Sequence, residues 1–129
     1  MNDQKLLVIE WKHLDVEGET CERCAGTIQE IRRAVEGLQK EGKLEGITVR
    51  IRDTPLSADR IGESNAILIN GVPIEAIVAA EVAPTPCPSC STLTGQESCC
   101  RALDVGGTRY EQVPADLIRS AVLRMLAYL

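Results

Sequence analysis

Aromatic residues are nearly absent from this chain of 129 residues, which contains one Trp, two Tyr and no Phe. Platforms that stack the bases of single-stranded nucleic acids are built from aromatic side chains. Positive charge is also scarce, because 14 Lys and Arg stand against 19 Asp and Glu, for a formal net charge of −5. Such a surface repels a phosphate backbone. The composition therefore predicts a protein without a nucleic-acid partner.

Long hydrophobic runs are missing as well. Uninterrupted aliphatic runs such as Leu6–Ile9 and Ala66–Ile69 are four residues long, whereas a membrane-spanning helix needs about 20 apolar residues. Residues 1–15 contain no basic region followed by a long apolar stretch and no small-residue cleavage site, so no signal peptide is visible. We therefore expect a cytoplasmic protein without a membrane partner.

Large aliphatic residues supply the core that the aromatic residues do not. Leu, Ile and Val number 13, 11 and 10, together 34 of the 129 residues. That share exceeds the roughly 20% below which a charged chain stays disordered. The length suits one core, so we expect a single domain over residues 1–129. No pattern in the sequence indicates an oligomeric state.

Hydrophobic spacing predicts alternating strands and helices. Residues 5–13 form an aliphatic run typical of a buried strand, and residues 47–53 alternate apolar and polar side chains before Pro55 ends the pattern. Between them, residues 21–41 show helical spacing. A short helix is expected over 57–61 with Ser57 as its N-cap, followed by a strand over 66–69 that ends in an Asn70–Gly71 turn. A short strand and a helical turn are expected within 72–82. The last expected elements are a hairpin around Gly106–Gly107 and a helix that has Pro114 at its first position. This order predicts an α/β domain with a mixed central sheet and a right-handed crossover between its first two strands.

Six cysteines are the most unusual feature of the composition. Without a signal peptide they stay largely reduced, so they do not serve as the disulfide staples of a small secreted domain. Cysteines in a reducing compartment indicate catalysis, redox exchange or metal binding. Single buried cysteines also act as small hydrophobic residues, but that explanation suits scattered cysteines better than two Cys-x-x-Cys pairs and an adjacent pair.

The first pair, Cys21 and Cys24, follows the predicted strand and loop at the expected start of a helix. Backbone N–H groups and the helix dipole favour a thiolate at that position. Because the spacing lets the two sulfurs close a disulfide, the motif predicts thiol–disulfide exchange in which Cys21 attacks and Cys24 resolves. The alternative for such a pair is one half of a zinc site.

The remaining four cysteines, Cys87, Cys90, Cys99 and Cys100, lie within a segment at about 83–100 that is rich in Pro, Ser and Thr and shows no periodicity. We expect a cysteine-rich loop there. Three alternatives stay open: a site for zinc or for a soft ion such as arsenite, mercury or copper(I), a disulfide relay to the first pair, and a disulfide-pinned insertion. Adjacent side chains splay, so Cys99 and Cys100 suit a single zinc ion poorly.

The Cys21–Cys24 motif at a helix start, together with Ser64–Gly71 (SNAILING), resembles the thioredoxin and glutaredoxin superfamily. The resemblance covers about residues 5–80 and the last helix. It implies a thioredoxin-like α/β fold, a mixed sheet flanked by helices, with the cysteine-rich loop as an insertion. Asn65 stands where those proteins place a cis-proline beside the dithiol. The chain as a whole is more similar to a family of small, cysteine-rich, thioredoxin-like proteins without an established activity.

The resemblance and the motifs together predict a thiol–disulfide oxidoreductase, or a redox-linked thiol protein, that uses Cys21 and Cys24. Its partner would be a protein or small-molecule thiol or disulfide, and the redox chemistry requires no cofactor. The alternative is a binding protein whose thiolates hold zinc or another thiophilic ion without turnover.

Three other residue types invite a functional interpretation. His13, the only histidine, follows a predicted strand and is expected to be a strand-end residue that supports a site rather than a ligand. Trp11 is expected in the core. Arg50 and Arg52 are expected on a solvated strand face.

Overall fold

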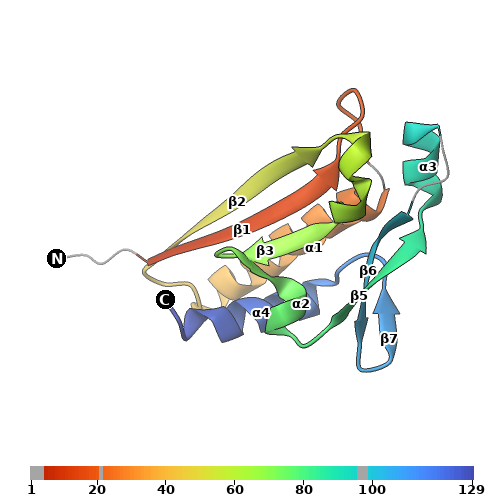
Figure 1. Cartoon of the computed structure of the whole chain (residues 1–129). Helices are drawn as coiled ribbons and strands as arrows, with labels where there is room; N and C mark the ends of the chain where they lie inside the picture. Colours follow the sequence, from red (N-terminus) through yellow and green to blue (C-terminus); the bar gives the residue numbers. More distant parts are fainter. Residues whose placement is uncertain (1–4, 21, 96–98) are drawn as a thin grey trace.

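The computed structural model describes residues 5–20, 22–95 and 99–129. It shows an α/β fold with two sheets and associated helices (Figure 1). The larger sheet is mixed and has the strand order β2-β1-β3-β4, and the smaller sheet is antiparallel with the order β5-β6-β7. The predicted strands at 5–13, 47–53 and 66–69 all lie in the larger sheet, as expected.

The chain begins with a strand–helix–strand unit. Strand β1 (Lys5–Leu14) pairs in parallel with β2 (Ile47–Leu56), and helix α1 (Glu22–Lys40) connects them. Parallel neighbours require such a crossover because a tight turn cannot return the chain in the same direction. Alternate residues of β1, among them Leu7, Ile9 and Trp11, are buried on one face. The predicted strand–helix–strand unit with parallel strands is confirmed.

Strand β2 runs past Pro55, so the prediction that this proline ends the strand is wrong. The sheet order makes β2 an edge strand, where one row of N–H groups has no neighbour to bond. A proline is tolerated in an edge strand because its missing backbone N–H can fall on the side that forms no hydrogen bonds with a neighbouring strand. Arg50 and Arg52 are exposed on this strand, as predicted.

The second half of the larger sheet is an antiparallel hairpin. Strand β3 (Ala66–Ile69) pairs with β1, and the Asn70–Gly71 turn leads into β4 (Val72–Pro73). Both turn residues have positive φ, 49° for Asn70 and 81° for Gly71, which matches the backbone twist of a two-residue hairpin. The predicted turn is confirmed, and the helical turn α2 (Ile74–Ile77) follows it as expected.

The predicted short helix after Ser57 is present as the 3₁₀ helix η1 (Ala58–Glu63). Ser57 occupies the N-cap position, but its hydroxyl makes no capping bond and instead donates to the Asp59 carboxylate. The expected element is therefore confirmed, while the expected capping bond is wrong. The neighbouring acceptor explains the difference, because an aspartate two residues on competes with the backbone N–H groups for the serine side chain.

Helix α4 (Ala115–Leu126) closes the described chain and packs against α1 and β3. Its buried residues Ile118, Ala121 and Val122 recur at helical spacing, as the sequence predicts. Pro114 is the N-cap, so the helix begins at Ala115, one residue later than predicted. In Figure 1, α1 and α4 lie together along one face of the larger sheet.

The segment at 83–100 is not the loop that we expected. Strand β5 (Glu81–Pro86) pairs with β6 (Cys99–Val105), and helix α3 (Pro88–Thr94) lies between them in sequence. Strand β5 is an edge strand, and its two prolines, Pro84 and Pro86, are two residues apart. Their missing N–H groups therefore fall on one side of the strand, which lets the other side pair with β6. The predicted Gly106–Gly107 turn joins β6 to β7 (Thr108–Tyr110).

One buried hydrophobic cluster joins the larger sheet to α1, α4 and the β5–β6 region. It contains Trp11 and both cysteines whose side chains are described, Cys24 and Cys87, together with Leu103 of β6. Trp11 is therefore a core residue, as predicted. No helix within the described ranges is both long enough and apolar enough to cross a lipid bilayer.

Candidate functional site

The predicted thiol motif lies at the carboxyl end of β1, where the chain turns into α1. Cys24 is in the first turn of α1, and its side chain is fully shielded from solvent at 0% exposure. Cys21 precedes the helix in the sequence but lies outside the described residues. The structure therefore describes the position of Cys24, the second cysteine of the motif, and the residues around it.

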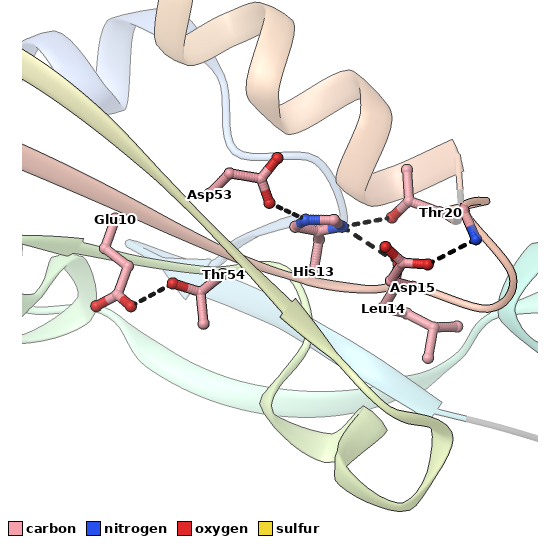
Figure 2. A network of polar contacts seen from close by, with 8 residues as sticks. Glu10, His13, Leu14, Asp15, Thr20, Asp53 and Thr54 are labelled. Atoms are coloured by element: carbon pink, nitrogen blue, oxygen red, sulfur yellow. Dashed lines mark hydrogen bonds and ion pairs between the residues drawn. The ribbon is translucent and has the colours of Figure 1, made fainter.

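A network of polar contacts centres on His13, near the end of β1 (Figure 2). His13 is buried, with 6% of the residue exposed. Its Nε2 contacts the Asp53 carboxylate on β2, and its Nδ1 lies 3.3 Å from both the Leu14 carbonyl oxygen and the Thr20 hydroxyl. Thr20 directly precedes Cys21 in the sequence. The only imidazole of the chain therefore lies beside the residue that leads into the motif.

Trp11 fixes the orientation of the His13 ring. The two rings stack, with centroids 3.8 Å apart and planes inclined by 11°. They are two residues apart on β1, so the pleat places them on the same face of the sheet. The Trp11 indole N–H is buried and has no hydrogen-bond partner among the described residues. Stacking from one side and polar contacts at both ring nitrogens leave the imidazole little freedom to rotate.

Asn65 lies directly before β3, next to the pairing of β3 with β1. The pairing of β1 with β3 ends at Lys12 and Ala66. His13 follows Lys12 and Asn65 precedes Ala66, so the backbones of His13 and Asn65 both lie next to this end of the ladder. Asn65 is 5% exposed and has a φ of 63°, in the left-handed region. Its Nδ2 donates to the Glu111 carbonyl oxygen at 2.7 Å. Every peptide bond in the described part of the chain is trans, including the one before Asn65.

Residues 111–113 contact both Asn65 and α1. Besides the bond from Asn65 to Glu111, the Val113 N–H donates to the Thr27 hydroxyl at 3.3 Å. A Cβ atom at Gly26 would approach the Gln112 side-chain amide carbon to 2.4 Å, so this glycine leaves room for the Gln112 side chain against α1. These contacts hold the start of α1 and the turn before β3 in one fixed arrangement.

The second Cys-x-x-Cys motif lies at the start of another helix. Cys87 directly precedes α3 and is 1% exposed, and its carbonyl oxygen accepts from the Ser91 N–H at 2.9 Å. Helix α3 contacts α1, so the two motif-bearing helices are neighbours in space. The two motifs are more than 60 residues apart in the sequence, and no pattern in the sequence indicated that their helices are neighbours.

The adjacent pair of cysteines joins the same region through strand pairing. Cys99 is in register with Pro86, and Cys100 with Thr85, so both backbones lie beside the chain that leads into Cys87. The side chains of Cys90, Cys99 and Cys100 lie outside what the structure describes. Among the described residues, no three His, Cys, Asp or Glu side chains gather closely enough to hold a metal ion.

A separate cavity of about 530 Å³ opens on the other face of the larger sheet. Lys12 lines it, and since Lys12 alternates with Trp11 and His13 along β1, its side chain points away from the thiol site. The Arg101–Glu75 ion pair also contributes to its wall. The cavity and the start of α1 are therefore two distinct regions of the molecule.

Comparison with known proteins places the chain in a family. Residues 7–122 match the family described as Domain of unknown function (DUF2703). The chain belongs to the DUF2703 family. The matched stretch contains both Cys-x-x-Cys motifs, His13 and Asn65. This DUF2703 protein is 38% identical over 116 residues to an uncharacterized protein of Archaeoglobus fulgidus, an alignment that covers 87% of the chain and 82% of the relative. No solved structure matches the chain significantly.

Proposed function

We propose that this DUF2703 protein is a thioredoxin-like thiol–disulfide oxidoreductase, or a redox-linked thiol protein, that works through Cys21 and Cys24. The observation that carries the proposal is the buried Cys24 in the first turn of α1, at the carboxyl end of β1. A shielded thiol three residues after another cysteine suits an internal resolving role, because it attacks only a disulfide already formed at its neighbour.

The arrangement of the larger sheet supports a thioredoxin-like single domain. A parallel β1-α1-β2 unit is followed by the antiparallel β3-β4 hairpin, and both long helices share one face of the sheet. Asn65, with its left-handed backbone, stands directly before β3, where the resemblance expects a cis-proline. A cytoplasmic location fits this function, since the reducing compartment keeps the two thiols available.

The exchange needs no cofactor and balances within the two partners. The Cys21 thiolate attacks one sulfur of a partner disulfide, forming a mixed disulfide and releasing the other sulfur as a thiolate, which takes up a proton. The Cys24 thiol then loses its proton and attacks Cys21, which releases the partner's second sulfur. The partner disulfide gains two electrons, and Cys21 and Cys24 become a disulfide.

Trapping of the intermediate tests this proposal. In the variant Cys24→Ser the second step is blocked, so a mixed disulfide between Cys21 and an added disulfide such as oxidised glutathione accumulates. In Cys21→Ser this adduct is absent. Mass spectrometry of digested protein identifies the cysteine that carries it.

The matched control is Cys90→Ser, which removes the second cysteine of the other Cys-x-x-Cys motif. This variant should complete the exchange at Cys21 without accumulating its adduct. The proposal fails if Cys24→Ser forms no adduct, or if its adduct is on Cys87 instead of Cys21.

The strand register favours a second candidate function, a thiolate site for zinc or a soft ion such as arsenite, mercury or copper(I). The β5–β6 ladder brings the backbones of Cys99 and Cys100 beside the chain that leads into Cys87 and Cys90. Thiolates select such ions by ligand type. A bound ion would also stabilise a segment that holds three prolines and one glycine.

Elemental analysis of protein purified without added metal tests this second candidate. We expect a stoichiometric thiophilic ion, and we expect the four distal cysteines to resist alkylation until a chelator is added. Cys21 and Cys24 serve as the internal reference in the same digest, since their labelling should not depend on the chelator. A metal-free protein whose distal cysteines label equally with and without chelator would contradict metal binding.

A further inference from the structure

We propose that the cavity on the other face of the larger sheet binds a small organic carboxylate, with Lys12 and Arg101 holding the carboxylate group and an aliphatic floor holding the apolar body of the ligand. This face, to which Lys12, Ala66 and Leu68 contribute, is called the outer face below. Cys24 lies in the hydrophobic core on the opposite side of the sheet. The inference therefore goes beyond the proposed thiol chemistry and does not rest on it.

The floor of the cavity is the outer face of β3. Ala66 and Leu68 lie two residues apart on this strand, so their side chains point to the same side. Ala66 is in register with Lys12 of β1. Leu68 is in register with Pro73 of β4. All four residues line the cavity, and its walls also include residues of η1, α2, β5 and β6. The strand register therefore places the Lys12 side chain at the border of an apolar floor.

The size and lining of the cavity suit an aliphatic ligand. Its volume of about 530 Å³ lies within the range of about 300–1,000 Å³ that is usual for small-molecule sites. The space exists because three of the lining residues are alanines, Ala66, Ala76 and Ala80. None of the described residues that line the cavity is aromatic. The floor therefore offers contact with an alkyl group rather than a stacking surface for a ring.

The carboxylates in the walls are already engaged by the protein. Glu63 accepts two hydrogen bonds from the Arg60 guanidinium, at 2.8 and 2.9 Å. Glu75 contacts Arg101 through Oε2, and its Oε1 is buried without a hydrogen-bond partner among the described residues. Because that oxygen is shielded from solvent, it is not offered to a ligand in the cavity. The walls therefore present few free acceptors.

The two cations of the cavity, in contrast, keep free donors. The Lys12 ammonium lies 3.8 Å from the Glu63 carboxylate, which is longer than a hydrogen bond. Glu10, the neighbouring carboxylate on the outer face of β1, turns to β2 instead (Figure 2). Arg101 contacts Glu75 through Nη2, and a guanidinium has five N–H groups. The Lys12 and Arg101 side chains are only 25% and 20% exposed, so water screens their charges less than at a fully exposed site.

Free donors beside occupied acceptors favour an anionic ligand. A carboxylate accepts several hydrogen bonds and forms short, charge-assisted ones with Lys and Arg. An inorganic anion would use the two cations but leave the floor in contact with water. An alkyl group attached to the carboxylate would cover Ala66 and Leu68 and gain the free energy of apolar burial. An amphipathic carboxylate therefore uses both parts of the cavity.

The first test compares three probes on the ¹⁵N-labelled full chain at constant ionic strength. Hexanoate carries both the carboxylate and the alkyl chain, acetate lacks most of the chain, and 1-hexanol lacks the charge. Backbone amide shifts are followed by two-dimensional NMR. We expect saturable shifts in β3 and α2 with hexanoate, and binding at least about tenfold weaker with the other two probes. If 1-hexanol binds as tightly as hexanoate, recognition of a carboxylate is wrong. If acetate binds as tightly, the cavity holds an adventitious ion only.

The second test removes the ammonium group. Lys12→Gln should weaken hexanoate binding about tenfold, because a charge-assisted hydrogen bond is lost, and should leave 1-hexanol binding unchanged. Lys12→Arg keeps the charge and should retain most of the affinity. The matched control is Lys5→Gln, which removes the same charge from β1 at a position that does not line the cavity. Its hexanoate affinity should equal that of the original protein.

The third test fills the cavity without changing its charge. Ala76 is an exposed residue of α2 that lines the cavity, so Ala76→Leu should fold and should weaken the binding of both hexanoate and 1-hexanol. Unchanged hexanoate affinity in either Lys12→Gln or Ala76→Leu would overturn the site. Trapping of the Cys21 adduct is measured separately, so the failure of one proposal leaves the other standing.

Discussion

At the scale of single residues, Asn65 shows how a local signal and a distant one combine. The sequence places an asparagine before the third strand of the sheet, and asparagine tolerates the left-handed conformation better than most residues. Its φ of 63° agrees with that tolerance. Its bond to Glu111 follows from no local pattern, because the two residues are 46 positions apart. The left-handed backbone of Asn65 agrees with a local preference of asparagine, whereas its hydrogen bond to Glu111 depends on how the whole chain folds.

Substitution of Asn65 separates these two contributions. Asn65→Gly loses the bond to Glu111 but adopts a positive φ readily, whereas Asn65→Ala loses the bond and also strains the backbone. We expect Asn65→Ala to be less stable than Asn65→Gly by about 1–2 kcal/mol. Urea denaturation followed by circular dichroism measures the difference. Equal stabilities of the two variants would show that the left-handed backbone imposes no strain at this position.

At the scale of elements, period-two and helical patterns predicted most of the larger sheet and both long helices. They did so because β1, α1 and α4 each bury one face, so the sequence carries the period of the structure. The patterns failed at β5 and α3, where prolines and small polar residues usually indicate a loop. The prolines of β5 are compatible with a strand only because it lies at a sheet edge, and that position depends on β6, which follows in the sequence.

The thiol site shows the same division between local and distant information. The sequence predicted a Cys-x-x-Cys motif at a helix start, and the observed first turn of α1 contains Cys24. It did not predict that Asp53 contacts His13, because that contact requires the parallel register of β1 and β2. The contact of α3 with α1 likewise needs the β5–β6 ladder to be in place.

At the scale of the whole molecule, ion pairs between exposed side chains make stability depend on pH. Arg119 on α4 bonds to Glu41 after α1 and lowers the pKa of that carboxyl below its ordinary value of 4.5. Arg60 lowers the pKa of Glu63 in the same way, and Arg109 lowers that of Asp104 below 3.8. The Glu41 pair joins the two helices that cover one face of the larger sheet.

The sign of the pH effect follows from these directions. A carboxyl whose pKa is lower in the folded state stabilises the fold above its ordinary pKa and loses that contribution as the pH falls through the folded value. We therefore expect the urea midpoint to decrease as the pH is lowered below 4.5. Arg119→Gln should show a smaller decrease over this window, and Arg32→Gln, which removes the same charge from an exposed position of α1, should match the original protein. An equal decrease in both variants would contradict a role for the Glu41 pair.

The stacking of Trp11 on His13 has an optical consequence. The chain contains one tryptophan, so its indole emission comes from a single place, and that place is the ring that contacts the entry to the thiol motif. An imidazolium in contact with an excited indole accepts electron density from it and quenches the emission. The protein therefore carries an intrinsic fluorophore at the thiol site, and its brightness reports the charge of the neighbouring imidazole without any attached label.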